Sequence, residues 1–189
     1  MEPDRVLEEI ERIAPSEALP ILGAHKGRIL DQVLGERQPK SAVEIGTLVG
    51  YSAIRIARLL PEGGKLTCLE INPEMAGRAL SNLRRAGLDR KVEIVVGDAR
   101  ESARRLKGPI DLLLVDASKK EYLAYLRASE HLLHPGSIVV ADNVKVFADQ
   151  MGDYLDYVRG SGKYDSRTVE SLLAGDPSAT DAMEISVRR

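Results

Sequence analysis

Short apolar runs alternate with helical patterns along most of the chain. The runs that predict buried strands cover residues 42–45, 66–71, 92–96, 110–115 and 137–141. Each is followed by a segment with apolar residues at helical spacing, at 51–60, 74–86, 99–106, 119–133 and 148–159. Strand–helix units in this succession predict an α/β fold, a mainly parallel sheet with helices on both faces.

Both ends of the chain depart from this alternation. Residues 1–38 carry two amphipathic stripes, and we expect them to form cover helices, the second of which should stop near Pro39. At the other end, YDSRTVESLL and DAMEISVRR predict two further strands, with AGDPSAT as the turn between them. The sheet should therefore end antiparallel. No linker or repeat interrupts the pattern, so we expect a single domain over residues 1–189.

Composition narrows the classes of partner. The 27 basic and 29 acidic residues give a formal charge of -2, so no overall field recruits nucleic acid or an anionic membrane. The single cysteine, Cys68, lies in an apolar run and indicates a reducing compartment. The N-terminus lacks the features of a secretory signal, and no apolar run is long enough for a membrane span. We expect a cytoplasmic protein, with no membrane association, that acts on small molecules.

An acidic residue stands at the end of each of the five predicted parallel strands. These residues are Glu44, Glu70, Asp98, Asp116 and Asp142. Taken singly, an Asp at such a place could simply cap a helix or form an Asx turn. Together they would gather at one edge of the sheet, where ligands bind in folds of this kind. Like charges that converge there repel one another unless cations or hydroxyl donors lie among them.

The first strand end favours a cationic nucleoside as the ligand. The turn reads E-x-G-x-x-x-G, from Glu44 through Gly46 to Gly50, whereas the dinucleotide fingerprint is G-x-G-x-x-G. Its glycines would let the backbone approach a ligand, and Glu44 would repel a pyrophosphate but attract an ammonium group. Glu70, 20 residues after Gly50, stands where an acid commonly binds a ribose diol, and Asp98 could accept from an adenine amino group. S-adenosylmethionine fits these acidic strand ends better than NAD does.

Five blocks in this order and spacing carry a family resemblance. They are VEIGTLVGYSAIRIARLL, LEINPEMA, VVGDARE, LLLVDASKKEYL and IVVADNV. The chain resembles the catechol O-methyltransferase family of class I S-adenosylmethionine-dependent enzymes, which is related to the caffeoyl-CoA O-methyltransferase type. The resemblance implies a Rossmann-like methyltransferase fold, with a seven-stranded sheet of order 3-2-1-4-5-7-6 in which strand 7 is antiparallel.

The resemblance also implies the cofactor site. The residues assigned to S-adenosylmethionine are Leu22, Glu44, Gly46, Tyr51, Ser52, Glu70, Ile71, Gly97, Asp98, Ala99 and Asp116. Tyr51 and Ser52 match positions at the methionine end of the cofactor, although either could instead be just the first turn of a helix.

The remaining strand ends predict a metal site. Asp116, Asp142 and Asn143 supply three oxygen ligands, which suits Mg²⁺ or another hard divalent cation that chelates two vicinal substrate hydroxyls. The alternative is that Asp142 and Asn143 only begin the next segment. By the resemblance, Lys119 is the general base beside Asp116. The positive charges of Mg²⁺ and of the cofactor sulfonium would favour the loss of its proton.

Two positions depart from the catechol enzymes. Ser118 stands where those enzymes have a tryptophan, and this chain has no tryptophan. Ala174 aligns with their substrate-holding glutamate, with Glu170 four residues earlier. The entrance and the selection of substrate should therefore differ.

Three functions follow from these observations. The first is Mg²⁺-dependent O-methylation of a small catechol-like diol by a monomer or homodimer. The second is methylation of a hydroxyuridine in tRNA, against which the balanced charge argues. The third is a regulator that binds S-adenosylmethionine without turnover.

Overall fold

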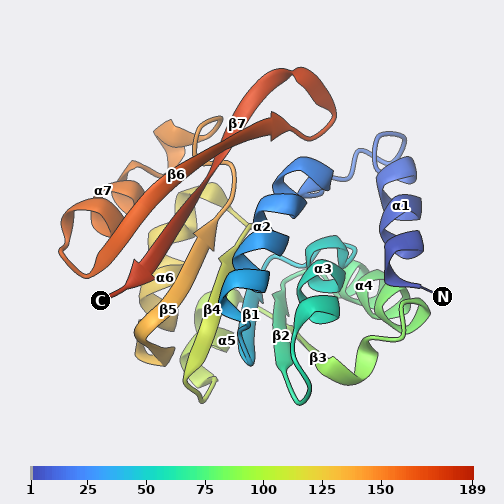
Figure 1. The fold of residues 1–189 in the computed structure, drawn as a ribbon, viewed down its shortest axis with the longest axis horizontal. Coiled ribbons are helices and arrows are strands. Elements are labelled where there is room, and N and C mark those ends of the chain that lie inside the picture. The colour runs from blue at the N-terminus through green and yellow to red at the C-terminus, as the bar shows by residue number, and fades with distance from the viewer. Residues whose placement is uncertain (1) are drawn as a thin grey trace.

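The structure, a computed structural model, describes residues 2–189 and contains one sheet in the order β3-β2-β1-β4-β5-β7-β6 (Figure 1). The strands are β1 (Ser41–Ile45), β2 (Lys65–Glu70), β3 (Val92–Val96), β4 (Ile110–Val115), β5 (Leu133–Ala141), β6 (Tyr164–Leu173) and β7 (Asp176–Arg188). Neighbours from β3 to β5 pair in parallel, and β7 runs antiparallel to both β5 and β6. The predicted order and direction of the strands are confirmed.

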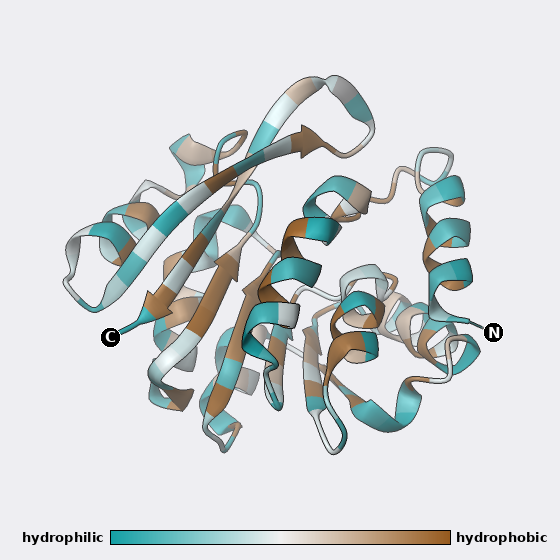
Figure 2. Ribbon diagram, viewed as in Figure 1, coloured by the Kyte–Doolittle hydropathy of each residue, from teal (hydrophilic) through white to brown (hydrophobic). Residues whose placement is uncertain are grey.

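Helices cover both faces of the sheet. They are α1 (Pro3–Ile13), α2 (Gly23–Arg37), α3 (Tyr51–Leu59), α4 (Pro73–Arg85), α5 (Ala99–Arg105), α6 (Tyr122–Ser129) and α7 (Gly152–Gly160). One apolar core gathers residues of α1 to α4 on one face, and a second gathers residues of α5 to α7 on the other. The central strands are mostly apolar in Figure 2, as expected for strands that are buried on both faces.

Local signals in the sequence set where these helices begin. The Asn72 side chain accepts from the Glu74 amide at 2.9 Å, and Pro73 occupies the first turn of α4. Asp98 caps α5 by accepting from the Arg100 amide at 2.8 Å. Both caps directly follow a strand, so the ends of β2 and β3 are held close to the helices that cover them.

Several predicted boundaries are wrong. The helix predicted over 119–133 ends at Ser129, and β5 begins at Leu133, earlier than residue 137. The Ser137 hydroxyl accepts from the His134 amide and donates to the Ile110 carbonyl. These two hydrogen bonds hold Pro135 and Gly136 in an irregular first part of the strand. Most of the predicted turn AGDPSAT belongs to β7, because its pairing with β6 continues to Leu173 opposite Asp176.

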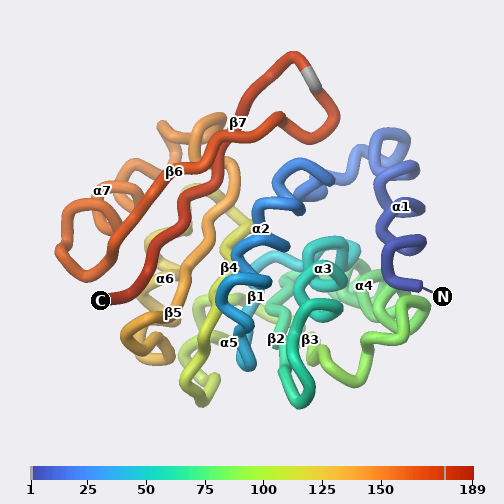
Figure 3. The backbone as a smooth tube through the Cα atoms, viewed as in Figure 1, coloured from blue at the N-terminus to red at the C-terminus, as the bar shows by residue number. Residues whose placement is uncertain are grey.

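The long β6–β7 hairpin positions the entrance to the site. In Figures 1 and 3 its far end extends beyond the sheet toward the start of α2. There a Cβ added to Gly23 would lie 2.8 Å from the Ala174 Cβ, so the hairpin end packs on the first turn of α2. Among residues 2–189, no helix combines the length and apolar character that a membrane span needs.

Candidate active site

A cavity of about 580 Å³ lies at the carboxyl ends of the parallel strands. The predicted site residues that line it are Leu22, Gly46, Tyr51, Ser52, Glu70, Ile71, Gly97, Asp98, Ala99, Asp116, Lys119, Asp142 and Asn143. Glu44 does not line the cavity, because its side chain is fully buried at the end of β1. Segments from the whole length of the sequence therefore meet at one edge of the sheet.

The turn after β1 needs both of its glycines. Gly46 has φ +88°, and a Cβ at this residue would lie 2.1 Å from the Asp116 carbonyl oxygen. Gly50 has φ +86°, and its Cβ would meet the backbone of Ala79 at 3.1 Å. These glycines allow the ends of β1 and β4 to approach each other and α3 to lie against α4.

Glu70 holds the same turn in place. Its Oε2 accepts from the Thr47 and Leu48 amides at 2.9 Å each, and its Oε1 accepts from the Asn72 amide at 2.9 Å. The carboxylate, predicted as a partner of a ribose diol, lines the cavity and also fixes its floor.

Glu44 lies buried below this floor. The Thr47 hydroxyl donates to its Oε2 at 2.9 Å, whereas its Oε1 has no hydrogen-bond partner among the described residues. Burial, with a smaller contribution from the charge of Asp116, raises the pKa of Glu44 to about 7. A buried carboxylate is a place that favours a cationic group nearby.

Replacing Glu44 with glutamine should change the pH dependence of stability. The unfolded chain releases this proton near pH 4.5 and the folded chain near pH 7, so the Glu44 contribution to stability falls as pH rises through this window. We therefore expect Glu44→Gln to gain stability relative to the parent protein by up to about 3 kcal/mol above pH 7. Urea unfolding of ligand-free protein between pH 4 and 8 measures the difference. The same change at the exposed Glu93 should leave the pH profile unaltered.

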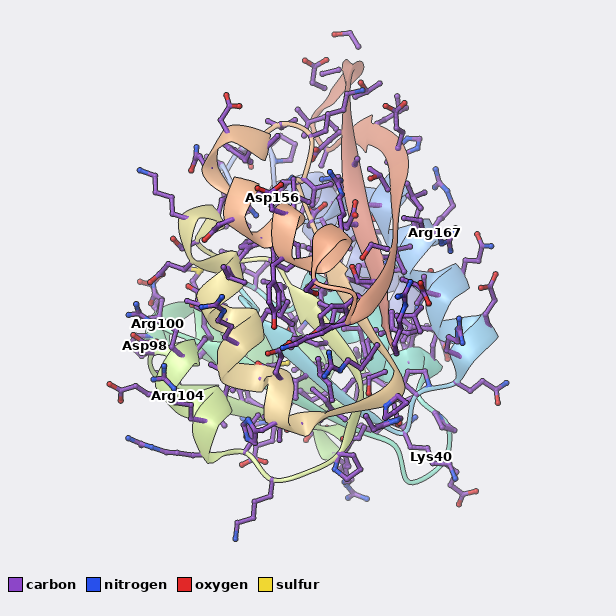
Figure 4. The ribbon with its side chains drawn as sticks, turned by 90° about the vertical axis from the view of Figure 1, so that its left-hand side faces the viewer. Lys40, Asp98, Arg100, Arg104, Asp156 and Arg167 are labelled. Carbon is purple, nitrogen blue, oxygen red and sulfur yellow. The ribbon has the colours of Figure 1, made fainter. Side chains whose placement is uncertain are left out.

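Asp98 has a charged partner at the other end of the cavity. Both of its oxygens contact the Arg100 guanidinium, the closest at 2.5 Å, and Arg100 also pairs with Glu121 at 2.7 Å. Asp98 and Arg100 lie side by side at the edge of the molecule in Figure 4. These hydrogen bonds lower the pKa of Asp98 to about 2, so the predicted adenine acceptor is ionised.

Asp116 and Lys119 form the centre of a polar chain across the site. The Lys119 Nζ donates to Asp116 Oδ1 at 2.7 Å and to the Tyr122 hydroxyl at 2.8 Å. Tyr122 in turn donates to the Asp142 carbonyl oxygen at 3.2 Å. The Lys119 side chain is held from two sides, with its ammonium between the ends of β4 and β5.

The donor set at these strand ends fits a hard divalent cation. Asp116, Asp142 and Asn143 offer two carboxylates and an amide oxygen, the ligand types of Mg²⁺. Burial and the repulsion from Asp116 together raise the pKa of Asp142 to about 7, although the nearby Lys26 opposes this effect. A cation between them would relieve this repulsion. Across residues 2–189 no group of three or more His, Cys, Asp or Glu side chains is placed to hold a metal.

Sequence reasoning missed a buried lysine and a buried aspartate beside this set. Lys26 is 1% exposed, and Asp181 on β7 is fully buried. Lys26 lies one helical turn before Leu30, on the apolar stripe of α2. A lysine at an apolar position of a helix indicates a buried charge, and the sequence alone could have shown this. Glu170 contributes nothing to the cavity, because it pairs with Lys145 at 2.8 Å on the surface.

This sheet order, with a ligand-sized cavity at the carboxyl edge, is that of Rossmann-like methyltransferases. Residues 2–156 match the sequence profile of a family described as O-methyltransferase. The chain therefore belongs to the O-methyltransferase family, as its motifs predicted.

Individual relatives agree with this assignment. Catechol O-methyltransferase B of Danio rerio is 39% identical over 173 residues, which cover 88% of this chain and 64% of that protein. Catechol O-methyltransferase of Mus musculus is 36% identical over 180 residues, which cover 91% of this chain and 67% of that protein. The chain thus spans about two thirds of these relatives. The crystal structure of the O-methyltransferase TomG from Streptomyces achromogenes, in complex with SAM, superposes with a TM-score of 0.85 at 26% identity, over 97% of this chain and 89% of that one.

Proposed function

We propose that the protein transfers a methyl group from S-adenosylmethionine to one hydroxyl of a small catechol-like diol. The observation that carries this proposal is the continuous cavity in which Glu70 and Asp98 lie at one end and Asp116, Lys119 and Asp142 at the other. The first end suits a nucleoside and the second suits a diol. Relatives named catechol O-methyltransferase, and the complex of TomG with SAM, support both halves.

The nucleoside end would bind and orient the methyl donor. Glu70 would accept from the ribose hydroxyls, and the buried Glu44 carboxylate would attract the ammonium of the methionine part from below the floor of the cavity. Gly46 would allow close approach of the backbone. Placement of donor and acceptor is the main contribution of such a site to the rate.

At the diol end, Asp116, Asp142 and Asn143 would hold a divalent cation. When bound, this ion would lower the pKa of the substrate hydroxyls and fix their position. Lys119, in its neutral amine form, would then accept the hydroxyl proton at Nζ, while Asp116 and the Tyr122 hydroxyl keep that nitrogen in place.

Apolar side chains surround the diol end. Phe147, whose ring centre is 6.0 Å from the Lys119 Nζ, lines the cavity together with Leu173 and Ala174 at the end of the hairpin. A flat aromatic ring suits this surface. Ala174 presents no carboxylate, so the second hydroxyl would depend on the cation for its binding.

Removal of the metal is the direct test. Protein incubated with S-adenosylmethionine and a panel of catechols should form methyl ethers in the presence of Mg²⁺. We expect product formation to fall at least about 100-fold with excess chelator, because the acceptor then loses both its placement and its activation. Mass spectrometry of the product measures this, and Mg²⁺ added back in excess should restore the rate.

Other outcomes would contradict the proposal. Turnover that is insensitive to chelator would refute the metal. Methylation of bulk tRNA without methylation of any small diol would favour the nucleoside acceptor instead. Binding of S-adenosylmethionine by equilibrium dialysis, without turnover on either substrate, would favour a regulator.

A further inference from the structure

A fully buried lysine, which lines the cavity, joins two buried carboxylates, and one of them is the proposed metal ligand Asp142. The Lys26 Nζ lies 2.7 Å from Asp142 Oδ1 and 2.6 Å from Asp181 Oδ2. The side chains of all three residues are at most 3% exposed. They come from α2, from the end of β5 and from β7, so the cluster ties together segments that are far apart in the sequence.

Asp181 also holds the backbone that follows Asp142. Its Oδ2 accepts from the Asn143 Nδ2 at 2.7 Å. Its Oδ1 accepts from the Lys145 and Val146 amides at 3.3 and 3.1 Å. Asp181 therefore anchors this turn from β7 through three hydrogen bonds.

These contacts fix the orientation of two proposed ligands. Because Lys26 is ion-paired with Asp142 Oδ1, Oδ2 is the carboxylate oxygen left for a cation. Because the Asn143 Nδ2 donates to Asp181, the amide oxygen is the Asn143 atom left for a cation. Asn143 has φ +62°, a left-handed conformation that the contacts with Asp181 help to hold.

A buried cluster of this kind rarely stabilises a fold better than apolar packing does. The free energy lost when two charged groups leave water is generally about as large as the free energy gained from their attraction. The cluster therefore indicates a role other than stabilising the fold. Groups that orient metal ligands from behind typically change metal affinity about 10–100-fold when they are removed.

We propose that Lys26 and Asp181 are positioning residues that preset Asp142 and Asn143 for a divalent cation. The proposal rests on the metal assignment made above. It assigns a role to β7 and to the start of α2 in a site whose proposed ligands all lie after β4 and β5.

Binding of Mn²⁺ alone, followed by electron paramagnetic resonance without acceptor, tests this directly. The decisive variant is the double substitution Lys26→Met/Asp181→Asn, which removes one charge of each sign and so leaves the net charge of the site unchanged. If only charge mattered, its Mn²⁺ affinity would equal that of the parent protein. We expect affinity to fall about 10–100-fold instead.

Asp181→Glu provides the complementary test. It keeps the charge but lengthens the side chain by one methylene group, so it should displace the Asn143 contact and weaken Mn²⁺ binding as well. S-adenosylmethionine affinity should stay within about threefold in both variants, which reports that the cavity is intact. Asp165 offers a matched control, because it forms an exposed ion pair with Arg189 far from the cavity. Asp165→Asn removes this ion pair and should leave Mn²⁺ affinity unchanged.

The outcomes are separable. Mn²⁺ affinity equal to that of the parent protein in the double variant, or in Asp181→Glu, would overturn the positioning role while leaving the metal site. A parent protein that binds no Mn²⁺ at all would overturn the metal assignment, and this proposal with it.

Discussion

Replacement of Lys119 with methionine is expected to lower kcat for diol methylation by about 10²–10⁴-fold, the usual contribution of a general base. The Lys119 Nζ is the basic nitrogen held between Asp116 and the Tyr122 hydroxyl at the diol end of the cavity. Methionine preserves most of the side-chain volume but has no site for a proton. Binding of S-adenosylmethionine should change little, since its proposed partners lie at the other end.

Two further variants separate base chemistry from charge. Lys119→Arg keeps the positive charge next to Asp116, but arginine does not release its proton in a protein, so it should be as slow as Lys119→Met. The exposed neighbour gives the matched control, and Lys120→Met should retain the parent rate. Steady-state kinetics with Mg²⁺ and a catechol measure all three. A Lys119→Arg enzyme within a few-fold of the parent rate would show that only the charge is needed.

The strand pattern of the sequence predicts most of this site because the fold places all parallel strand ends at one edge. Glu70, Asp98, Asp116 and Asp142 are far apart in the chain, yet each lies at or just after the end of an apolar run. Once the alternation of strand and helix is recognised, their convergence follows from the geometry of parallel sheets. The same reasoning could not give side-chain partners, such as the contact between Asp98 and Arg100.

Residues outside the strand ends were harder to predict. Lys26 belongs to a helix that was interpreted only as a cover helix. Asp181 lies inside the last strand, and the pattern of that segment predicts a strand without indicating any special role for one residue. Their roles depend on which side chains meet across the sheet, and single-sequence patterns carry no such pairing. The early start of β7 was missed for a related reason, because Asp176 pairs with Leu173 only across an irregularity in the register, which a single sequence does not show.

Substitution of alanine for Gly46 is expected to cause the largest loss among changes at the cofactor end. A Cβ at this position would lie 2.1 Å from the Asp116 carbonyl oxygen, and φ +88° is strained for any residue with a side chain. The backbone cannot yield as a flexible side chain would, so the ends of β1 and β4 must separate by about 1 Å, a displacement that can cost about 10²-fold in rate.

We therefore expect Gly46→Ala to bind S-adenosylmethionine at least about 100-fold more weakly and to lose about 3 kcal/mol of unfolding free energy. Isothermal titration calorimetry and urea unfolding measure the two effects. Gly77→Ala is the matched control, because Gly77 lies within α4 and a Cβ there meets nothing within 4 Å. That change should stabilise the protein slightly, as alanine is the better helix former. Near-parent cofactor affinity in Gly46→Ala would mean that the β1 turn can open without harm, and that the close approach of β1 to β4 is not what shapes the cofactor pocket.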